Sequence, residues 1–176
     1  SVVNWAIING EKFLGLTVHK IDSKIDTGDI ILKRMINISK YDNYNSILNK
    51  IYEKTPKLII DSIYMLKKNK KFIKQSTIKI KPSFFPLRKE GDEIINEPLD
   101  INSAYNFIRG LSYPGPYARV VYKKKIIYII SASNKFYFKI NGLKVFLGNL
   151  IFQKGENFFL KCKKGYLKIN IFVNEK

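Results

Sequence analysis

Cysteine, histidine and long apolar runs are nearly absent from this sequence, and each absence excludes a class of protein. The lone cysteine, Cys162, has no partner for an internal disulfide and no cluster of metal-ligating residues around it, so we expect no metal site and a cytoplasmic setting. No apolar run approaches the roughly 20 residues that cross a bilayer, so we expect no membrane partner. The first residues also lack the basic region and cleavage site of a signal peptide.

Acidic residues are also scarce, since Lys and Arg number 32 against 14 Asp and Glu, a net charge of +18. Such a protein can bind nucleic acid or other anions. Alternatively, the lysines reflect a compositional bias on solvated faces. The second interpretation is favoured because arginine, the better fork for phosphate, occurs only four times.

Hydrophobic residues make up 45% of the 176 positions, enough to bury the core of one domain or slightly more. The order of the segments begins with a short helix over residues 1–8 that Asn9-Gly10 ends. Strands are predicted over residues 14–21 and 30–38, and their closeness in sequence favours an antiparallel pair joined by the loop 22–29.

The clearest helix is predicted over residues 44–68, where apolar residues recur at intervals of three and four and Asp42 or Asn43 can cap the start. Pro56 should end or kink this helix. The basic run at residues 67–71 is either a solvated helix end or a phosphate-contact patch, and the first is favoured.

A linker-like stretch over residues 72–96 and a short helix over residues 102–111 follow. The sequence YPGPY after this helix excludes a helix or a central strand there. From residue 118 onward, short β runs alternate with Asn141-Gly142, Lys154-Gly155 and Lys164-Gly165, which are hairpin or bulge signals. The tail is therefore predicted to be a small antiparallel β barrel or sandwich.

The loop between the first two strands contains the strongest candidate site. Asp26 stands two residues before Gly28, where the backbone can approach a ligand closely, and Asp29 follows. An Asp in Asp-Thr-Gly is more often a turn cap, so the residues alone leave both interpretations of Asp26 open. His19 is either a half-buried strand histidine, which is favoured, or a substrate contact.

The segment NWAIINGEKFLGLTVHKIDSKIDTGDII resembles the second half of the catalytic domain of formyltetrahydrofolate-dependent formyltransferases. That family shows a similar helix, an Asn/Asp-Gly-Glu break, a Thr-Gly-Val-Thr-like strand and an Asp-x-Gly-Asp loop. FFPLRKEGDEI resembles the Arg-x-Pro-Glu-Asp-Gly-x-Ile element of the sugar-modifying branch, and FIRGLSYPGPYA resembles the stretch after it. The resemblance runs in order from residue 2 to about residue 120.

The resemblance implies an α/β fold with a partial Rossmann-like formyltransferase core, followed by a β-rich, open-barrel-like C-terminal domain. Residues 1–80 would be the second half of the catalytic domain, residues 81–117 a linker with a short helix, and residues 118–176 the β-rich domain. The chain is then expected to be a fragment that lacks the first strands of its core. Exposed apolar surface on such a fragment predicts poor solubility or association, for example as a homodimer.

The resemblance also implies that Asp26 is the catalytic carboxylate and that Ile25, Thr27 and Gly28 contact the pterin of the cofactor, N10-formyltetrahydrofolate. Arg88 and Arg109 are the candidate substrate-binding residues, Arg88 for a phosphate and Arg109 for a carboxylate across the domain junction. For both arginines, a surface or packing role is an equally open interpretation. The family's catalytic Asn and His belong to an Asn-x-His segment expected to precede this chain. His19 does not match that position, so the isolated chain is expected to be inactive.

Three functions are therefore compared. The first, favoured by FFPLRKEGDEI and Thr17-Val18-His19, is formylation of the amino group of a nucleotide-linked amino sugar. The second is formylation of methionyl-tRNA, which the charge of +18 and the β tail would suit. The third is a non-catalytic fragment or basic module that binds nucleic acid or a partner through the β tail, with Phe136, Tyr137 and Phe138 as stacking residues.

Overall fold

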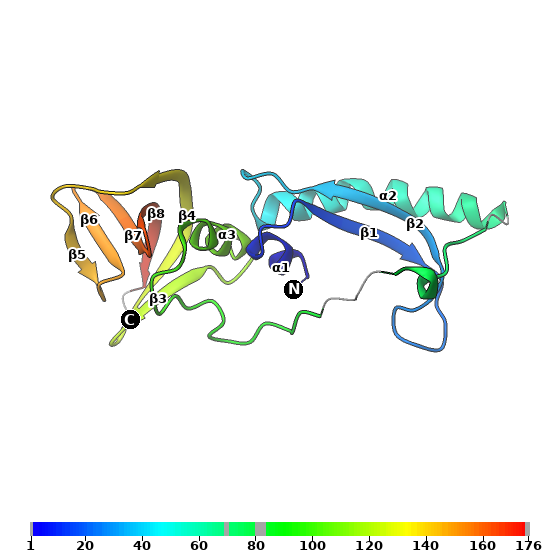
Figure 1. Cartoon of the computed structure of the whole chain (residues 1–176), viewed down its shortest axis with the longest axis horizontal. Helices are drawn as coiled ribbons and strands as arrows, with labels where there is room; N and C mark the ends of the chain where they lie inside the picture. Colours follow the sequence, from blue (N-terminus) through cyan, green and yellow to red (C-terminus); the bar gives the residue numbers. More distant parts are fainter. Residues whose placement is uncertain (1, 69–70, 80–83, 175–176) are drawn as a thin grey trace.

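The computed structural model of the chain describes residues 2–68, 71–79 and 84–174, and it has an elongated shape with a β-sheet toward each end (Figure 1). Helices α1 and α3 lie side by side between the two sheets. This arrangement confirms the α/β fold class with a β-rich second part. No helix in the described ranges is long and apolar enough to cross a membrane.

The first sheet is an antiparallel pair of strands, as predicted, and it carries the candidate loop. Helix α1 (Val2–Ile8) is followed by a turn at Gly10, whose φ of 70° lies in the left-handed region that glycine adopts without strain. Strand β1 (Phe13–His19) then pairs with β2 (Ile30–Asn37). Apolar residues of α1, both strands and the next helix form a small core of their own: Ile7, Leu14, Ile36, Ile38 and Ile47.

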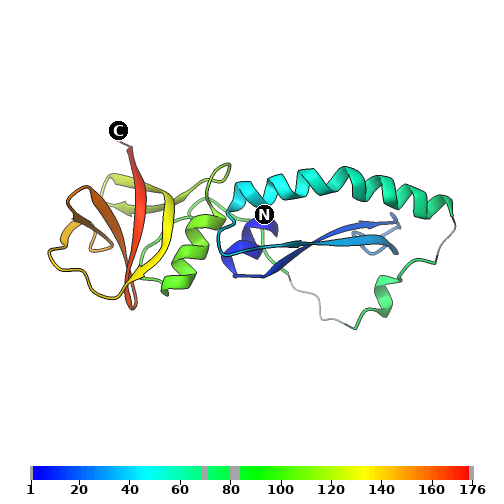
Figure 2. The same ribbon diagram turned by 90° about the horizontal axis from the view of Figure 1, so that it is seen from above.

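Helix α2 (Tyr44–Lys67) runs alongside this sheet (Figure 2). Its N-cap is Asn43, one of the two predicted caps, which forms a capping box with Ser46. The prediction that Pro56 ends a helix is wrong, because α2 continues through it, and the alternative of a kink at Pro56 stays a prediction. Tyr52, whose carbonyl Pro56 leaves without an N–H donor, is exposed, so water can hydrate that carbonyl.

A 3₁₀ helix, η1 (Gln75–Thr77), and helix α3 (Ile101–Gly110) lie in the stretch that leads to the second sheet. Asp100 caps α3, which starts at Ile101, one residue before the predicted start. The Asn4 amide donates to the Gly110 carbonyl at 2.7 Å, which joins α1 to the end of α3. On its other side α3 buries apolar residues in the core of the second sheet: Ala104, Ile108 and Leu111. Helix α3 therefore contributes to the core of the second sheet.

The second sheet has six antiparallel strands in the order β3-β4-β8-β7-β6-β5, and it curls into a half-barrel (Figure 1). The strands are β3 (Ala118–Tyr122), β4 (Lys125–Tyr137), β5 (Lys144–Leu147), β6 (Ile151–Lys154), β7 (Asn157–Cys162) and β8 (Gly165–Asn174). Lys154-Gly155 and Lys164-Gly165 do mark hairpins, between β6 and β7 and between β7 and β8.

One predicted turn differs from the structure, and the structure has one turn that was not predicted. Asn141-Gly142 does not form a hairpin between neighbouring strands, because β4 pairs with β8 and β5 pairs with β6. The apolar run LKVFLGNLIF is divided into β5 and β6 by Gly148 and Asn149, which both have positive φ and form a tight turn. Part of the basic run at residues 67–71 and the predicted boundary at residues 80–81 lie outside the described residues.

Candidate functional site

The loop from Lys20 to Asp29 is closed at its base by backbone contacts. The Lys20 N–H donates to the Asp29 carbonyl at 2.9 Å. Gly28 is buried against the same segment, and a Cβ at this position would lie 1.8 Å from the Lys20 carbonyl oxygen. The close approach expected at Gly28 is therefore made to the protein's own backbone, and only glycine fits there.

Asp22, which sequence reasoning did not single out, is the acid that holds the turn. Its Oδ1 accepts the Thr27 hydroxyl at 2.7 Å and the Lys24 N–H at 3.0 Å. The hydrogen bond from Thr27, followed by that from Lys24, lowers the pKa of Asp22. The turn-capping role considered for Asp26 is thus filled by Asp22. The Thr27 side chain stabilises the loop by donating a hydrogen bond to Asp22.

Asp26 presents its carboxylate to solvent. Its φ of 56° is in the left-handed region, and its side chain is 84% exposed. The His19 Nε2 lies 3.5 Å from its Oδ1. His19 Nδ1 lies 2.8 Å from the Lys20 carbonyl, so Nδ1 carries a proton, and Nε2 can donate to Asp26 only when the ring is an imidazolium. The structure thus brings together two groups that the sequence analysis treated separately.

Gln75 in η1 also contacts this loop, and nothing in the sequence indicated it. Its side-chain amide donates to the Asp26 carbonyl at 3.0 Å and to the Gly28 carbonyl at 2.7 Å. A glutamine 49 residues from Asp26, in a stretch without a motif, carries no chemical signal. The other cofactor-site candidate, Ile25, is exposed at the tip of the loop.

The guanidinium groups of Arg88 and Arg109 are engaged inside the protein. Arg88 pairs with Glu93 at 3.7 Å, and Glu93 is buried and also pairs with Arg119. Neither Arg88 nor Arg109 has a described contact with the Asp26 loop. Their role in substrate binding stays a prediction.

Arg109 joins the two halves of the molecule through backbone carbonyls, where a carboxylate had been expected. Its NH1 donates to the carbonyls of Ser39 at 2.9 Å and Asp42 at 2.6 Å, and its Nε donates to Asn106. Desolvation by burial lowers the pKa of Arg109. A half-buried cation in this position can be retained because several oxygen atoms face it.

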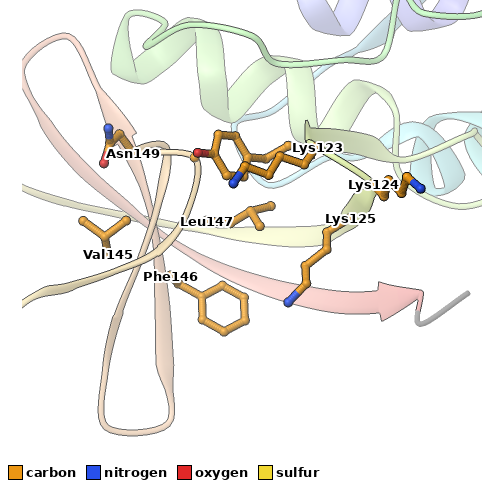
Figure 3. A pocket seen from close by; sticks show the side chains of 9 residues that line it. Lys123, Lys124, Lys125, Val145, Phe146, Leu147 and Asn149 are labelled. Carbon is orange, nitrogen blue, oxygen red and sulfur yellow. The ribbon is translucent and has the colours of Figure 1, made fainter.

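A separate recess of about 660 Å³ opens on the second sheet, where the β3–β4 turn meets the β5–β6 turn (Figure 3). It does not include Asp26. Val145, Phe146 and Leu147 supply an apolar side, and three successive lysines follow Tyr122 at its rim. Gly148 packs on the Tyr122 ring so closely that a Cβ would lie 3.1 Å from it. The recess combines apolar surface with positive charge.

Residues 1–63, which contain the whole Asp26 loop, match the formyl transferase family. Over this segment the chain resembles the formyltransferase family. The methionyl-tRNA formyltransferase of Desulforamulus reducens is 31% identical over 128 residues, covering 72% of this chain and 39% of that protein. The bifunctional polymyxin resistance protein ArnA of Wigglesworthia glossinidia brevipalpis is 32% identical over 170 residues, covering 96% of this chain and 25% of that protein.

Solved formyltransferases share the fold of the whole described chain. A sugar 3N-formyl transferase crystallised with dTDP and 5-N-formyl-THF superimposes with a TM-score of 0.65 at 22% identity, covering 99% of this chain and 60% of that one. The methionyl-tRNA formyltransferase of Clostridium thermocellum gives a TM-score of 0.62 at 23% identity, covering 100% and 63%. The chain therefore spans 60% and 63% of these two solved proteins, and 39% and 25% of the two curated relatives.

Proposed function

We propose that this chain is part of an enzyme that transfers a formyl group from N10-formyltetrahydrofolate to an amine. The observation that carries the proposal is the Asp-Thr-Gly-Asp loop inside the family match, with Asp26 exposed and its turn held by other residues. Solved neighbours crystallised with tetrahydrofolic acid, 5-N-formyl-THF or folinic acid support the choice of cofactor.

The chemistry gives Asp26 a defined task. The amine attacks the formyl carbon, its nitrogen loses a proton as the tetrahedral intermediate forms, and the oxyanion of that intermediate needs a hydrogen-bond donor. A carboxylate beside an imidazole orients the ring and favours its cationic form, which can donate to the oxyanion. In the proposed enzyme, the Asn-x-His segment implied by the family resemblance would supply that imidazole and Asp26 would hold it.

The contact between Asp26 and His19 supports the proposal, because it places an imidazole of the same chain beside this carboxylate. The 3.5 Å separation and the exposed position of Asp26 leave its second oxygen open to another group. A carboxylate has acceptor sites for more than one donor, so a second imidazole can bind without displacing the first. This geometry supports Asp26 as an orienting carboxylate.

For the acceptor, we propose the amino group of a nucleotide-linked amino sugar. The alignment with ArnA extends over 96% of this chain at 32% identity, whereas the methionyl-tRNA formyltransferase of Azobacteroides pseudotrichonymphae, which aligns over 95% of the chain, is 26% identical. Another solved neighbour, from Helicobacter canadensis, was crystallised with folinic acid and dTDP-3-aminofucose. These relatives and the FFPLRKEGDEI element favour the sugar.

Methionyl-tRNA is the second candidate because of the charge of the second sheet. Between residues 118 and 173 the sequence has one acidic residue, Glu156, against twelve basic ones. The lysines at the recess in Figure 3 are part of this surface. Binding of a tRNA backbone to such a surface would weaken steeply as salt rises, because bound counterions are released from the phosphates.

The full-length protein distinguishes these acceptors. Turnover of N10-formyltetrahydrofolate is followed with a panel of nucleotide-linked amino sugars and, in parallel, with methionyl-tRNA. We expect turnover with an amino sugar that is only weakly salt-dependent. Turnover with methionyl-tRNA alone would contradict the amino sugar as acceptor and support methionyl-tRNA. No turnover with any amine would contradict the proposed function itself.

A further inference from the structure

The segment that follows α2 crosses the base of the Asp26 loop and is tied to it at several points. Ile73 exchanges two backbone hydrogen bonds with Ile30, at 2.8 and 3.2 Å. The Lys20 ammonium lies 4.6 Å from the centre of the Phe72 ring. Gln75 then reaches into the loop with its side-chain amide. The loop is thus held from outside by a segment that lies about 50 residues further along the chain.

The contact made by Gln75 sets the orientation of two peptide groups. The amide nitrogen carries two hydrogens, and both are used, one on the Asp26 carbonyl and one on the Gly28 carbonyl. In a planar trans peptide the N–H points opposite to the C=O, so the N–H groups of Thr27 and Asp29 face away from Gln75. The left-handed φ of Asp26 is unfavourable for a residue with a Cβ and needs support from its surroundings.

We propose that Gln75 is a positioning residue for the Asp26 loop. This inference rests on the proposed function, because it assigns Gln75 the task of holding the Asp26 carboxylate where the reaction needs it. Asp22 and Thr27 order the loop from within, and Gln75 fixes it to the rest of the protein. Without the two hydrogen bonds the loop keeps its internal turn but loses its anchor.

The sharpest test is Gln75→Glu in the full-length protein, because a carboxylate has nearly the same shape and cannot donate to the two carbonyls. Gln153→Glu is the matched control, since the Gln153 amide donates to the Gly155 carbonyl at 2.9 Å in the β6–β7 turn, far from the loop. Both variants are measured for kcat, for the KM of the acceptor amine, and for amide hydrogen exchange over residues 20–30.

We expect Gln75→Glu to lower kcat by about 10- to 100-fold, because small misplacements of a catalytic group have effects of this size. The KM of the acceptor should stay within about twofold, since a positioning residue acts on the transition state rather than on substrate binding. Amide exchange over the loop should become faster. Gln153→Glu should match the wild-type protein in all three measurements.

Two results would overturn the assignment: a wild-type kcat in Gln75→Glu, or a reduced kcat with unchanged exchange in the loop. Failure of the proposed function gives a different result. In that case the wild-type protein transfers no formyl group to any amine, while the exchange measurement still reports whether Gln75 anchors the loop. Faster exchange in Gln75→Glu would then still support the role of Gln75 in holding the loop. Unchanged exchange would contradict that role.

Discussion

Asp22 and Asp26 lie four positions apart in one loop, and their surroundings divide their roles. Asp22 accepts hydrogen bonds from Thr27 and Lys24 and so fixes the turn. The Asp26 carboxylate has a single contact within the described residues, to His19, and stays exposed, while the Asp26 backbone carbonyl accepts from Gln75. A carboxylate that the fold does not use is available for chemistry, which the sequence could not show because both acids stand beside turn residues.

Gly28 gives a prediction at the same scale. Replacing it by alanine places a methyl group against the Lys20 carbonyl, so the loop must move. We expect Gly28→Ala to lower the free energy of unfolding by about 2–4 kcal/mol, as steric overlap in packed sites does. Urea denaturation measures this change.

Gly142→Ala is the control for Gly28→Ala. Nothing lies within 4 Å of the Cβ that Gly142 would gain, although its φ of 72° is unfavourable for alanine. The expected cost is about 1 kcal/mol from the backbone alone. Equal losses in the two variants would contradict the close approach at Gly28.

At the scale of the elements, the start of α2 depends on a buried carboxylate. Burial alone would raise the pKa of Asp42, but hydrogen bonds from Lys50, the Ser39 N–H and Ser46 outweigh it and lower the pKa to about 2. A depressed pKa stabilises the fold above the ordinary value of 3.8, and the contribution is lost as the pH falls toward 2.

The change Asp42→Asn tests this linkage. It should lower the free energy of unfolding by about 2 kcal/mol at pH 7, because it removes the stabilisation that holds the pKa of Asp42 at about 2. The difference from wild type should shrink between pH 4 and pH 2 in urea denaturation. Asp61→Asn is the control, because its ion pairs with Arg34 and Lys57 are exposed and contribute little. A difference for Asp42→Asn that is independent of pH would contradict the account.

How far the elements could be predicted depended on how local their signals were. The strands β1 and β2, the cap Asn43 and the turns at Gly155 and Gly165 follow from neighbouring residues, and the structure confirms them. The continuity of α2 through Pro56 depends on packing, and the anchor Gln75 acts across 49 residues. Such long-range features are decided by tertiary contacts that no local pattern encodes.

At the scale of the whole molecule, α1 and α3 form the joint between the two sheets, and Arg109 spans it. This guanidinium contacts the Ser39 and Asp42 carbonyls on one side and extends from α3, which packs on the second sheet. The two sheets have separate cores. They are coupled by the packing of α1 on α3 and by hydrogen bonds across the joint, among them the one from Asn4 to Gly110.

Replacing Arg109 by lysine should weaken this coupling, since an ammonium cannot reproduce the fork that holds both carbonyls and Asn106. We expect a loss of about 2–3 kcal/mol, typical of buried hydrogen bonds to a charged group. The unfolding transition should also broaden or separate into two. Arg34→Lys, at an exposed position, should stay within about 0.5 kcal/mol of wild type. A single sharp transition of unchanged midpoint in Arg109→Lys would contradict a coupling role.

The central claim is that Asp26 is a catalytic carboxylate in formyl transfer, and the rate of Asp26→Asn in the full-length protein tests it most directly. The matched control is Asp29→Asn, in the same loop, where only the backbone carbonyl has a described contact. We expect Asp26→Asn to lower kcat by at least about 100-fold, within the range that general acid–base catalysis contributes, and Asp29→Asn to keep most of it. A wild-type rate of formyl transfer in Asp26→Asn would contradict the account.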